Sequence, residues 1–209
     1  MGAGIAQDAK YRWPLIYDSY AKKCSLNQFG IGEILWETSE SQFVALFPTK
    51  THWRMPSKIG YIKSGLQTLR KDIIEKSINS VALPYLGCSN GGLEWAEVKP
   101  LIKTILSEIS DLEVELWEFS QDFVDKDFEK FRDVYLALNN RDALSWLKFS
   151  KKTEKLIRNT ISNNQITNFV QLSMMKGVGD KTLKKIYEAA LGRSYPTVQT
   201  PLNFSSSTK

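Results

Sequence analysis

A lysine at the end of a predicted strand is the first residue in this 209-residue chain with the type and position to do chemistry. It is Lys50, preceded by Thr49, in the segment FPTKTHWR that spans residues 47–54. Ligands of open α/β sheets bind outside the carboxyl ends of the strands. Lys50 and Arg54 are therefore placed to meet an anion or a sugar. The alternative is that Lys50 is an ordinary surface lysine at the end of a strand.

Two glycine-rich segments flank this lysine in the sequence. The first runs into a predicted helix and comprises Gly2, Ala3, Gly4, Ile5 and Ala6. The second lies between a predicted buried strand and a helix and comprises Gly87, Cys88, Ser89, Asn90, Gly91, Gly92 and Leu93. Glycines before a helix N-terminus let backbone N–H groups approach a phosphate closely. Two such loops in one α/β domain predict a diphosphate ligand, and the alternative is a pair of tight structural turns.

A candidate site of another kind lies in residues 169–190, which resemble a helix-hairpin-helix motif. The pattern is an apolar residue, then Gly-Val-Gly, then a lysine-rich helix whose N-terminal N–H groups face one DNA phosphate. The small core predicted for it is Met175, Val178, Leu183 and Ile186. The predicted DNA-binding residues are Lys176, Gly177, Gly179, Lys181, Thr182, Lys184 and Lys185. The alternative is a helical turn used for packing or for a protein partner.

The basic charge of the chain is concentrated in its last third. Residues 1–120 hold 13 Lys and Arg against 14 Asp and Glu, whereas residues 148–193 hold 10 against 3, a net charge of +7. Phosphate neutralisation supplies sequence-independent affinity, so a basic block is the footprint expected of a nucleic-acid binder. A set of solvated helix faces would produce the same count.

Hydrophobic periodicity predicts the elements that must position these residues. In the first half, helices are expected at 15–23, 59–76 and 94–109, and strands at 33–37, 43–48, 80–86 and 112–118. This alternation predicts an α/β fold with helices on the faces of a sheet. After residue 120 only helices are expected, at 124–138, 141–149, 151–162, 165–175 and 180–190. We expect domains at 1–120 and 121–193, followed by a flexible tail at 194–209.

The composition of the chain excludes several classes of protein. Apolar residues make up 42% and charged residues 24% of the chain, as in globular proteins. No apolar run reaches the roughly 18 residues of a membrane helix, so we expect no membrane association. Two distant cysteines indicate a reduced, cytoplasmic compartment. The single histidine excludes a histidine-rich metal site, and we expect neither a metal nor a cofactor.

Three segments in order, MGAGIA, FPTKTHWR and LPYLGCSNGGLEW, resemble those of macrodomains. The resemblance covers residues 1–118 and is to the group containing the DarG antitoxin and the terminal ADP-ribose protein glycohydrolase. It implies a three-layer α/β fold, with a mixed sheet between helices and both glycine-rich loops around ADP-ribose. It also implies hydrolysis of an ADP-ribosyl bond by Lys50, which acts as an acid, a polarising cation or a nucleophile.

The resemblance also suggests a substrate. The protein-directed relative has an aspartate where this chain has Gly91, which favours the DarG-like branch that acts on thymine-linked ADP-ribose in DNA. It implies a DarT-like toxin as partner. The chain starts inside the first glycine-rich loop, so we expect the first strand of the sheet to be missing and activity to suffer. The alternatives are a non-catalytic binder of ADP-ribose or modified DNA, and a protein-directed hydrolase.

Overall fold

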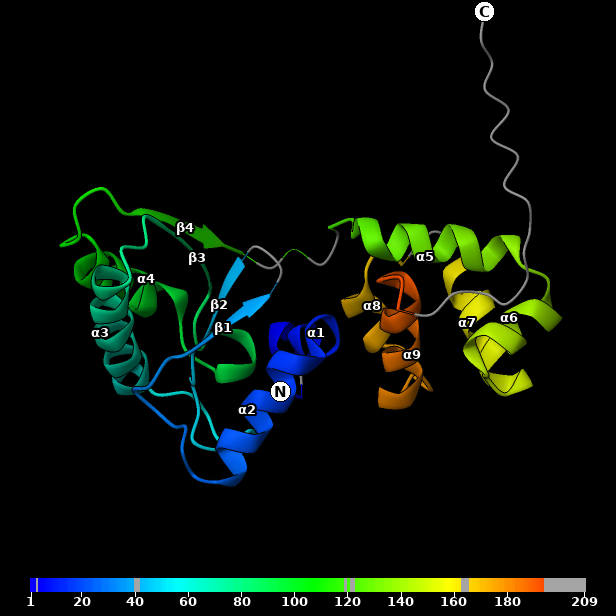
Figure 1. Ribbon diagram of the computed structural model, residues 1–209, viewed down its shortest axis with the longest axis horizontal. Coiled ribbons are helices and arrows are strands. Elements are labelled where there is room, and N and C mark those ends of the chain that lie inside the picture. Colours follow the sequence, from blue (N-terminus) through cyan, green and yellow to red (C-terminus); the bar gives the residue numbers. More distant parts are fainter. Residues whose placement is uncertain (3, 40–41, 119, 121–122, 163–165, 194–209) are drawn as a thin grey trace, which may run out of the picture. The chain divides into compact units, whose positions relative to one another are not determined.

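The computed structural model describes residues 1–2, 4–39, 42–118, 120, 123–162 and 166–193. The chain divides into two compact units, residues 1–120 and 121–209, and each is considered by itself (Figure 1). The predicted tail, residues 194–209, lies outside the described residues. Across the described part of the chain, no helix combines the length and the apolar character needed to cross a membrane.

The first unit alternates helices and strands, which confirms the predicted α/β class. Its elements are α1 (Gly4–Arg12), α2 (Pro14–Ser25), β1 (Leu35–Ser39), β2 (Gln42–Leu46), α3 (Ile59–Glu75), β3 (Ser80–Pro84), the 3-10 turn η1 (Ser89–Gly91), α4 (Trp95–Leu106) and β4 (Glu113–Trp117). Helix α3 matches the predicted range to within one residue at its end. The predicted strands all form, each displaced or shortened by one or two residues.

The strands are of mixed direction and form two pairs. Strands β1 and β2 are antiparallel, with Leu35 opposite Leu46. Strands β3 and β4 are parallel, with Ser80 opposite Glu113, and helix α4 makes the crossover between them. Among the described residues these are separate two-stranded sheets rather than one continuous sheet.

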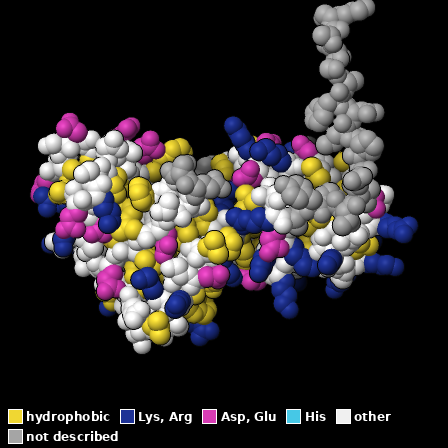
Figure 2. Space-filling view, viewed as in Figure 1, with side chains coloured by type: hydrophobic (Ala, Val, Ile, Leu, Met, Phe, Trp, Pro, Cys, Tyr) yellow, Lys and Arg dark blue, Asp and Glu magenta, His cyan; other side chains and the backbone are white. Residues whose placement is uncertain are grey.

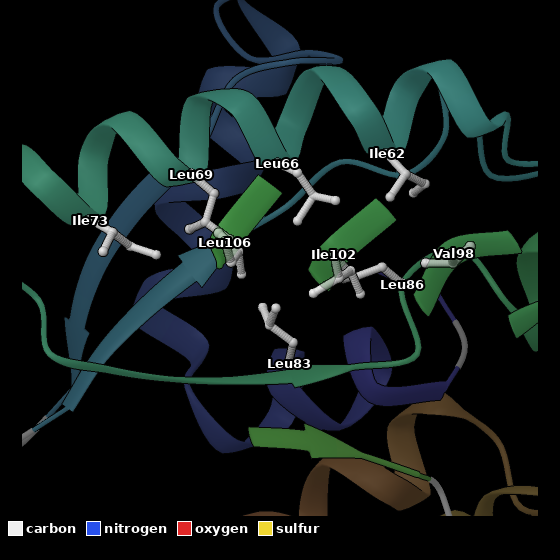
Figure 3. Close-up of a cluster of buried hydrophobic side chains, with 9 residues drawn as sticks. All are labelled: Ile62, Leu66, Leu69, Ile73, Leu83, Leu86, Val98, Ile102 and Leu106. Carbon is white, nitrogen blue, oxygen red and sulfur yellow. The ribbon is translucent and has the colours of Figure 1, made fainter. Parts of the chain in front are cut away.

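Helix α3 lies over β3 and α4 and buries one apolar stripe against them (Figure 3). The stripe of α3 consists of Ile62, Leu66, Leu69 and Ile73, all at most 1% exposed. It faces Leu83 of β3 and the residues Val98, Ile102 and Leu106 of α4. Burying each such side chain contributes on the order of 1.5–3 kcal/mol, so this cluster dominates the stability of the unit. On α4, Leu106 is buried, whereas Ile105 and Ile109 are only partly buried.

Two polar contacts hold the β1–β2 ribbon and the segment before it on α3. The indole N–H of Trp36 donates to the carboxylate of Asp72 at 2.6 Å, and the hydroxyl of Thr68 donates to the carbonyl of Gly32 at 2.5 Å. Strand β2 then ends at the buried Leu46. The chain therefore enters the Lys50 segment from a fixed position beside α3.

The described residues of the second unit contain helices and no strand, as predicted. The helices are α5 (Lys126–Ala137), α6 (Asn140–Leu147), α7 (Lys151–Ser162), α8 (Phe169–Ser173) and α9 (Asp180–Ala190). Aromatic rings form much of their core: Phe169 stacks on Tyr187 with centroids 4.0 Å apart, and Phe131 lies 6.1 Å from the buried Trp146.

Side-chain caps set the starts of three of these helices. Asp125 accepts hydrogen bonds from the N–H groups of Asp127 and Phe128 at the start of α5. Asn139 and Asn168 do the same for α6 and α8. Because Asn168 caps α8, that helix begins at residue 169, and the predicted helix over 165–175 is too long.

Candidate functional site

Lys50 lies in the loop between β2 and α3, and its side chain reaches the second glycine-rich segment. Its ammonium group donates a hydrogen bond to the backbone carbonyl of Asn90, 40 residues further along the chain. The side chain is half-buried. The structure therefore joins the predicted catalytic lysine to the predicted ligand-binding loop.

A second contact ties the same loops together seven residues after Lys50. The backbone N–H of Ser57 donates to the carbonyl of Gly91 at 2.8 Å. Ser57 is only 5% exposed, and within the described part of the chain its hydroxyl has no hydrogen-bond partner. A buried hydroxyl without a partner is costly, which marks it as a group for a ligand or an ordered water. Sequence reasoning missed Ser57, because nothing local distinguishes it from other surface-type serines.

The space around Gly91 explains why a glycine stands there. A Cβ added to Gly91 would lie 2.5 Å from the Ser57 hydroxyl oxygen and 4.0 Å from the Lys50 Cε. Gly91 is not among the residues with positive φ, so the requirement is close packing and not backbone conformation. Any side chain at this position, including a carboxylate, must displace Ser57.

The loop itself is held by short-range hydrogen bonds. The N–H groups of Gly91 and Gly92 donate to the carbonyls of Cys88 and Ser89 at 3.0 Å, and Leu93 N–H donates to Gly87 at 3.1 Å. Gly87 and Gly92 have φ of +71° and +79°, values that glycine adopts without strain. These N–H groups were predicted to face a diphosphate, and in this conformation they bond within the loop.

The first glycine-rich segment meets the second at Asn90. Gly4 has φ of +57°, and a Cβ added there would lie 3.5 Å from the Asn90 side-chain nitrogen. Gly2 and Ile5 are exposed and Ala6 is half-buried, whereas Ala3 lies outside the described residues. The structure thus brings Gly4, Lys50 and Gly91 close to Asn90.

Cys88 is a poor nucleophile in this setting. Its half-buried thiol donates to the Leu86 carbonyl at 3.7 Å. Burial, and secondarily the negative charge of Glu94, raise the pKa of the Cys88 thiol above its ordinary value. The thiol therefore stays protonated at neutral pH, so Cys88 lacks the thiolate that a nucleophile needs.

In the second unit, residues 174–179, where the hairpin is predicted, connect α8 to α9. Gly177 has φ of +94°, and a Cβ there would lie 2.9 Å from a methyl carbon of Leu156. Gly179 has extended backbone, φ −102° and ψ 176°, and open space at its Cβ position. Only Gly177 therefore needs glycine for the turn, whereas the conformation of Gly179 suits any residue. Its carbonyl accepts from Thr182 and Leu183, so it caps α9.

The predicted hairpin core is correct for three residues and wrong for one. Val178, Leu183 and Ile186 are 8%, 2% and 0% exposed, whereas Met175 is 38% exposed. Leu172 of α8 fills the buried position instead. Met175 follows the end of α8 and is turned outward by the hairpin.

The hairpin lysines differ in what they contact. Lys176, Lys181 and Lys184 are exposed. The Lys184 ammonium group lies 4.0 Å from the carboxylate of Glu188. Lys185 instead donates to the carbonyl of Lys148 at 2.9 Å, just past the end of α6, and lies 5.6 Å from the Phe149 ring. Lys185 thus stabilises the C-terminus of α6, whereas the other three lysines are exposed to solvent.

The family model of the Macro domain matches residues 1–102. Together with the fold and a 37% identity to a solved macrodomain that this chain covers to 82%, this shows that the chain belongs to the macrodomain family. Within that family it is similar to "DNA ADP-ribosyl glycohydrolase" of Thermus aquaticus, 39% identical over 122 residues, or 56% of this chain and 34% of that protein. The protein of the same name from Mycobacterium tuberculosis is 36% identical over 121 residues, with the same coverage. The chain spans about a third of the length of these relatives.

Solved structures of DarG macrodomains are also similar to this chain. The macrodomain of M. tuberculosis DarG is 37% identical with a TM-score of 0.56, and that of T. aquaticus DarG is 39% identical with a TM-score of 0.54. Each match covers 57% of this chain and 82% of that structure. Thermosipho africanus DarTG in complex with ADP-ribose is 30% identical with a TM-score of 0.53, covering 59% of this chain and 36% of that one. The predicted macrodomain fold, and the likeness to DarG, are confirmed.

Proposed function

We propose that this protein is a DarG-like hydrolase that removes ADP-ribose from a thymine base of DNA. The observation that carries the proposal is the hydrogen bond from Lys50 to the Asn90 carbonyl, which holds the lysine where the two glycine-rich segments meet. The relatives named DNA ADP-ribosyl glycohydrolase support the same reaction.

The reaction breaks the bond between the anomeric carbon of the distal ribose and a base nitrogen. The departing base keeps the electron pair, water adds to the anomeric carbon, and the two protons of water end on the new hydroxyl and on the base. Positive charge develops on the sugar and negative charge on the base. The Lys50 ammonium group faces the departing base and either protonates it or steadies its charge.

Two features support DNA as the carrier of the ADP-ribosyl group. At Gly91, Ser57 occupies the space that a carboxylate would need, so the aspartate of the protein-directed relative has no counterpart. In the second unit, the net charge of +7 over residues 148–193 suits a phosphate backbone. Lys and Arg side chains project from this unit on the face shown in Figure 2. Its hairpin holds the polymer and raises the effective concentration of substrate.

In this proposal a DarT-like toxin supplies the modified DNA in the cytoplasm. The T. africanus relative carries both activities in its name, "DNA ADP-ribosyl transferase-DNA ADP-ribosyl glycohydrolase fusion protein", which favours such a pairing.

The test uses the full chain and a single-stranded oligonucleotide with ADP-ribose on one thymine. Release of free ADP-ribose, followed by mass spectrometry, is expected for the wild type and for Lys103→Ala, an exposed lysine of α4. It is not expected for Lys50→Ala. Release from ADP-ribosylated protein alone would make the chain a protein-directed hydrolase. Binding of the modified oligonucleotide without release would make it a non-catalytic reader.

A further inference from the structure

The segment that follows Lys50 exposes aromatic rings paired with cations. Trp53 is 70% exposed, and the Arg54 guanidinium lies over its ring at 4.6 Å. His52 packs beside Trp53 with ring centroids 5.8 Å apart, and Lys58 lies 5.5 Å from the ring of Tyr61. An exposed tryptophan is unremarkable alone, but two adjacent cation–aromatic pairs make a surface with a definite chemistry.

The charge around this segment departs from that of the rest of the unit. Residues 41–71 contain six basic residues and no acidic one. Of the 13 basic residues in 1–120, the other seven share the remaining sequence with all 14 acidic residues. Two of the six, Arg70 and Lys71, pair with Glu108 and Glu75. Residues 50–63 alone hold four basic residues and no acidic one, so the segment is basic within a unit that is slightly acidic as a whole.

Both ends of the segment are attached to the loop that carries Asn90 and Gly91. Lys50 is held by the Asn90 carbonyl and Ser57 by the Gly91 carbonyl, and between them Met55 N–H closes a turn on His52 at 2.9 Å. Trp53 is three residues from Lys50, so the two Cα atoms lie at most about 11 Å apart. That distance is of the order of one or two nucleotides of an extended strand.

We propose that residues 51–61 form a platform for single-stranded DNA, binding the nucleotides next to the modified base. Trp53 stacks on a neighbouring unpaired base, and Arg54 and Lys58 neutralise the adjacent phosphates. Alternating aromatic and cationic groups are the common device for binding single strands without reading sequence. In a duplex the base faces are covered by their neighbours, so the platform selects unpaired substrate. This inference rests on the proposed function, since it extends the same site to the polymer.

The kinetic test compares two substrates of the full chain. One is a twelve-nucleotide strand with a central ADP-ribosylated thymine, and the other is ADP-ribosylated thymidine alone. Loss of one base stack, worth roughly 1–3 kcal/mol, raises KM for the strand by about 5- to 150-fold in Trp53→Ala. Turnover of the nucleoside substrate stays unchanged, and Trp53→Phe retains most of the affinity for the strand. Trp117→Ala is the matched control, because Trp117 is 63% exposed in the same unit but outside the platform.

A contact test without hydrolysis separates this inference from the proposed function. An unmodified single strand carrying 5-iodouracil is irradiated with the full chain, and the cross-linked peptide is identified by mass spectrometry. The cross-link is expected on the Trp53 peptide, and unlabelled single strand competes for it more effectively than duplex or an acidic peptide. If this result comes without any ADP-ribose release, the platform stands and the proposed hydrolysis fails.

Three results would overturn the platform. They are equal loss of turnover on both substrates in Trp53→Ala, cross-links confined to residues 121–193, and equal competition by an acidic peptide. As a check on the phosphate contacts, Arg54→Gln flattens the logarithmic salt dependence of single-strand affinity by about 0.7 for one lost contact.

Discussion

The two candidate sites of this molecule are built on opposite principles. In the first unit, Lys50 and Ser57 reach Asn90 and Gly91 across 40 and 34 residues of chain. In the second, Gly177 lies in the short stretch that joins α8 to α9, and Lys181 lies in the first turn of α9. The first site therefore depends on how distant loops pack, and the second on local turn geometry and helix caps. Substitutions in the two sites should accordingly differ in their effects on activity, stability and DNA affinity.

The largest effect is expected at the first site, from Lys50→Ala. Removing the group that stabilises the departing base should lower turnover of ADP-ribosylated DNA by about 100-fold or more. Thermal stability should change little, because Lys50 lies outside the α3–α4 core. Lys50→Arg tests whether positive charge alone is enough, because arginine keeps the charge but neither protonates a leaving group nor attacks a sugar readily. Near-normal turnover by Lys50→Ala would remove the lysine from the mechanism.

Gly91→Ala should reduce stability through long-range packing. The new Cβ meets the Ser57 hydroxyl, and such overpacking costs about 1–3 kcal/mol of unfolding free energy. Adding Ser57→Ala should recover part of that loss, because it removes the oxygen that the Cβ meets. Urea unfolding of the two single variants and the double variant measures this coupling. Gly2→Ala, with open space at its Cβ, is the control. Strictly additive losses would show that the two residues do not share this space.

At the hairpin, substitutions of the two glycines should differ in their effect on stability. Gly177→Ala forces an L-residue to φ of +94° against Leu156, which should cost about 1–2 kcal/mol of stability. Gly179→Ala meets neither strain nor a neighbour, so stability should change by less than about 0.5 kcal/mol. If the α9 N-terminus binds a phosphate, Gly179→Ala should still weaken DNA affinity, measured by fluorescence anisotropy. Unchanged affinity would leave the hairpin a packing element.

The smallest effects distinguish the hairpin lysines from one another. Lys181→Ala should flatten the logarithmic salt dependence of duplex affinity by about 0.9, for one lost phosphate contact, and leave stability unchanged. Lys185→Ala should instead lower stability by about 0.5–1 kcal/mol, since the ammonium group bonds the carbonyl past α6. An unchanged salt slope in Lys181→Ala would assign the phosphate contacts to other residues. An unchanged unfolding transition in Lys185→Ala would make that bond dispensable.

Much of the element structure was predictable because the signals are local. Helices α7 and α9 match their predicted ranges, 151–162 and 180–190, since apolar spacing marks a buried face irrespective of its partner. The error at α8 was also local in origin, as the cap at Asn168 was not recognised. The predicted burial of Met175 is wrong for another reason, because its exposure depends on the direction that the chain takes after α8.

The sequence by itself determined which segments carry the chemistry, because glycine-rich loops, a strand-end lysine and a lysine-rich helix are patterns of neighbouring residues. It also determined the macrodomain likeness and the concentration of positive charge after residue 147. Only the tertiary structure decided that Ser57 packs against Gly91 with a buried hydroxyl that has no hydrogen-bond partner among the described residues. It also decided that Lys185 bonds the carbonyl just past the end of α6. Such roles arise from contacts between segments tens of residues apart, and neither local propensity nor spacing records them.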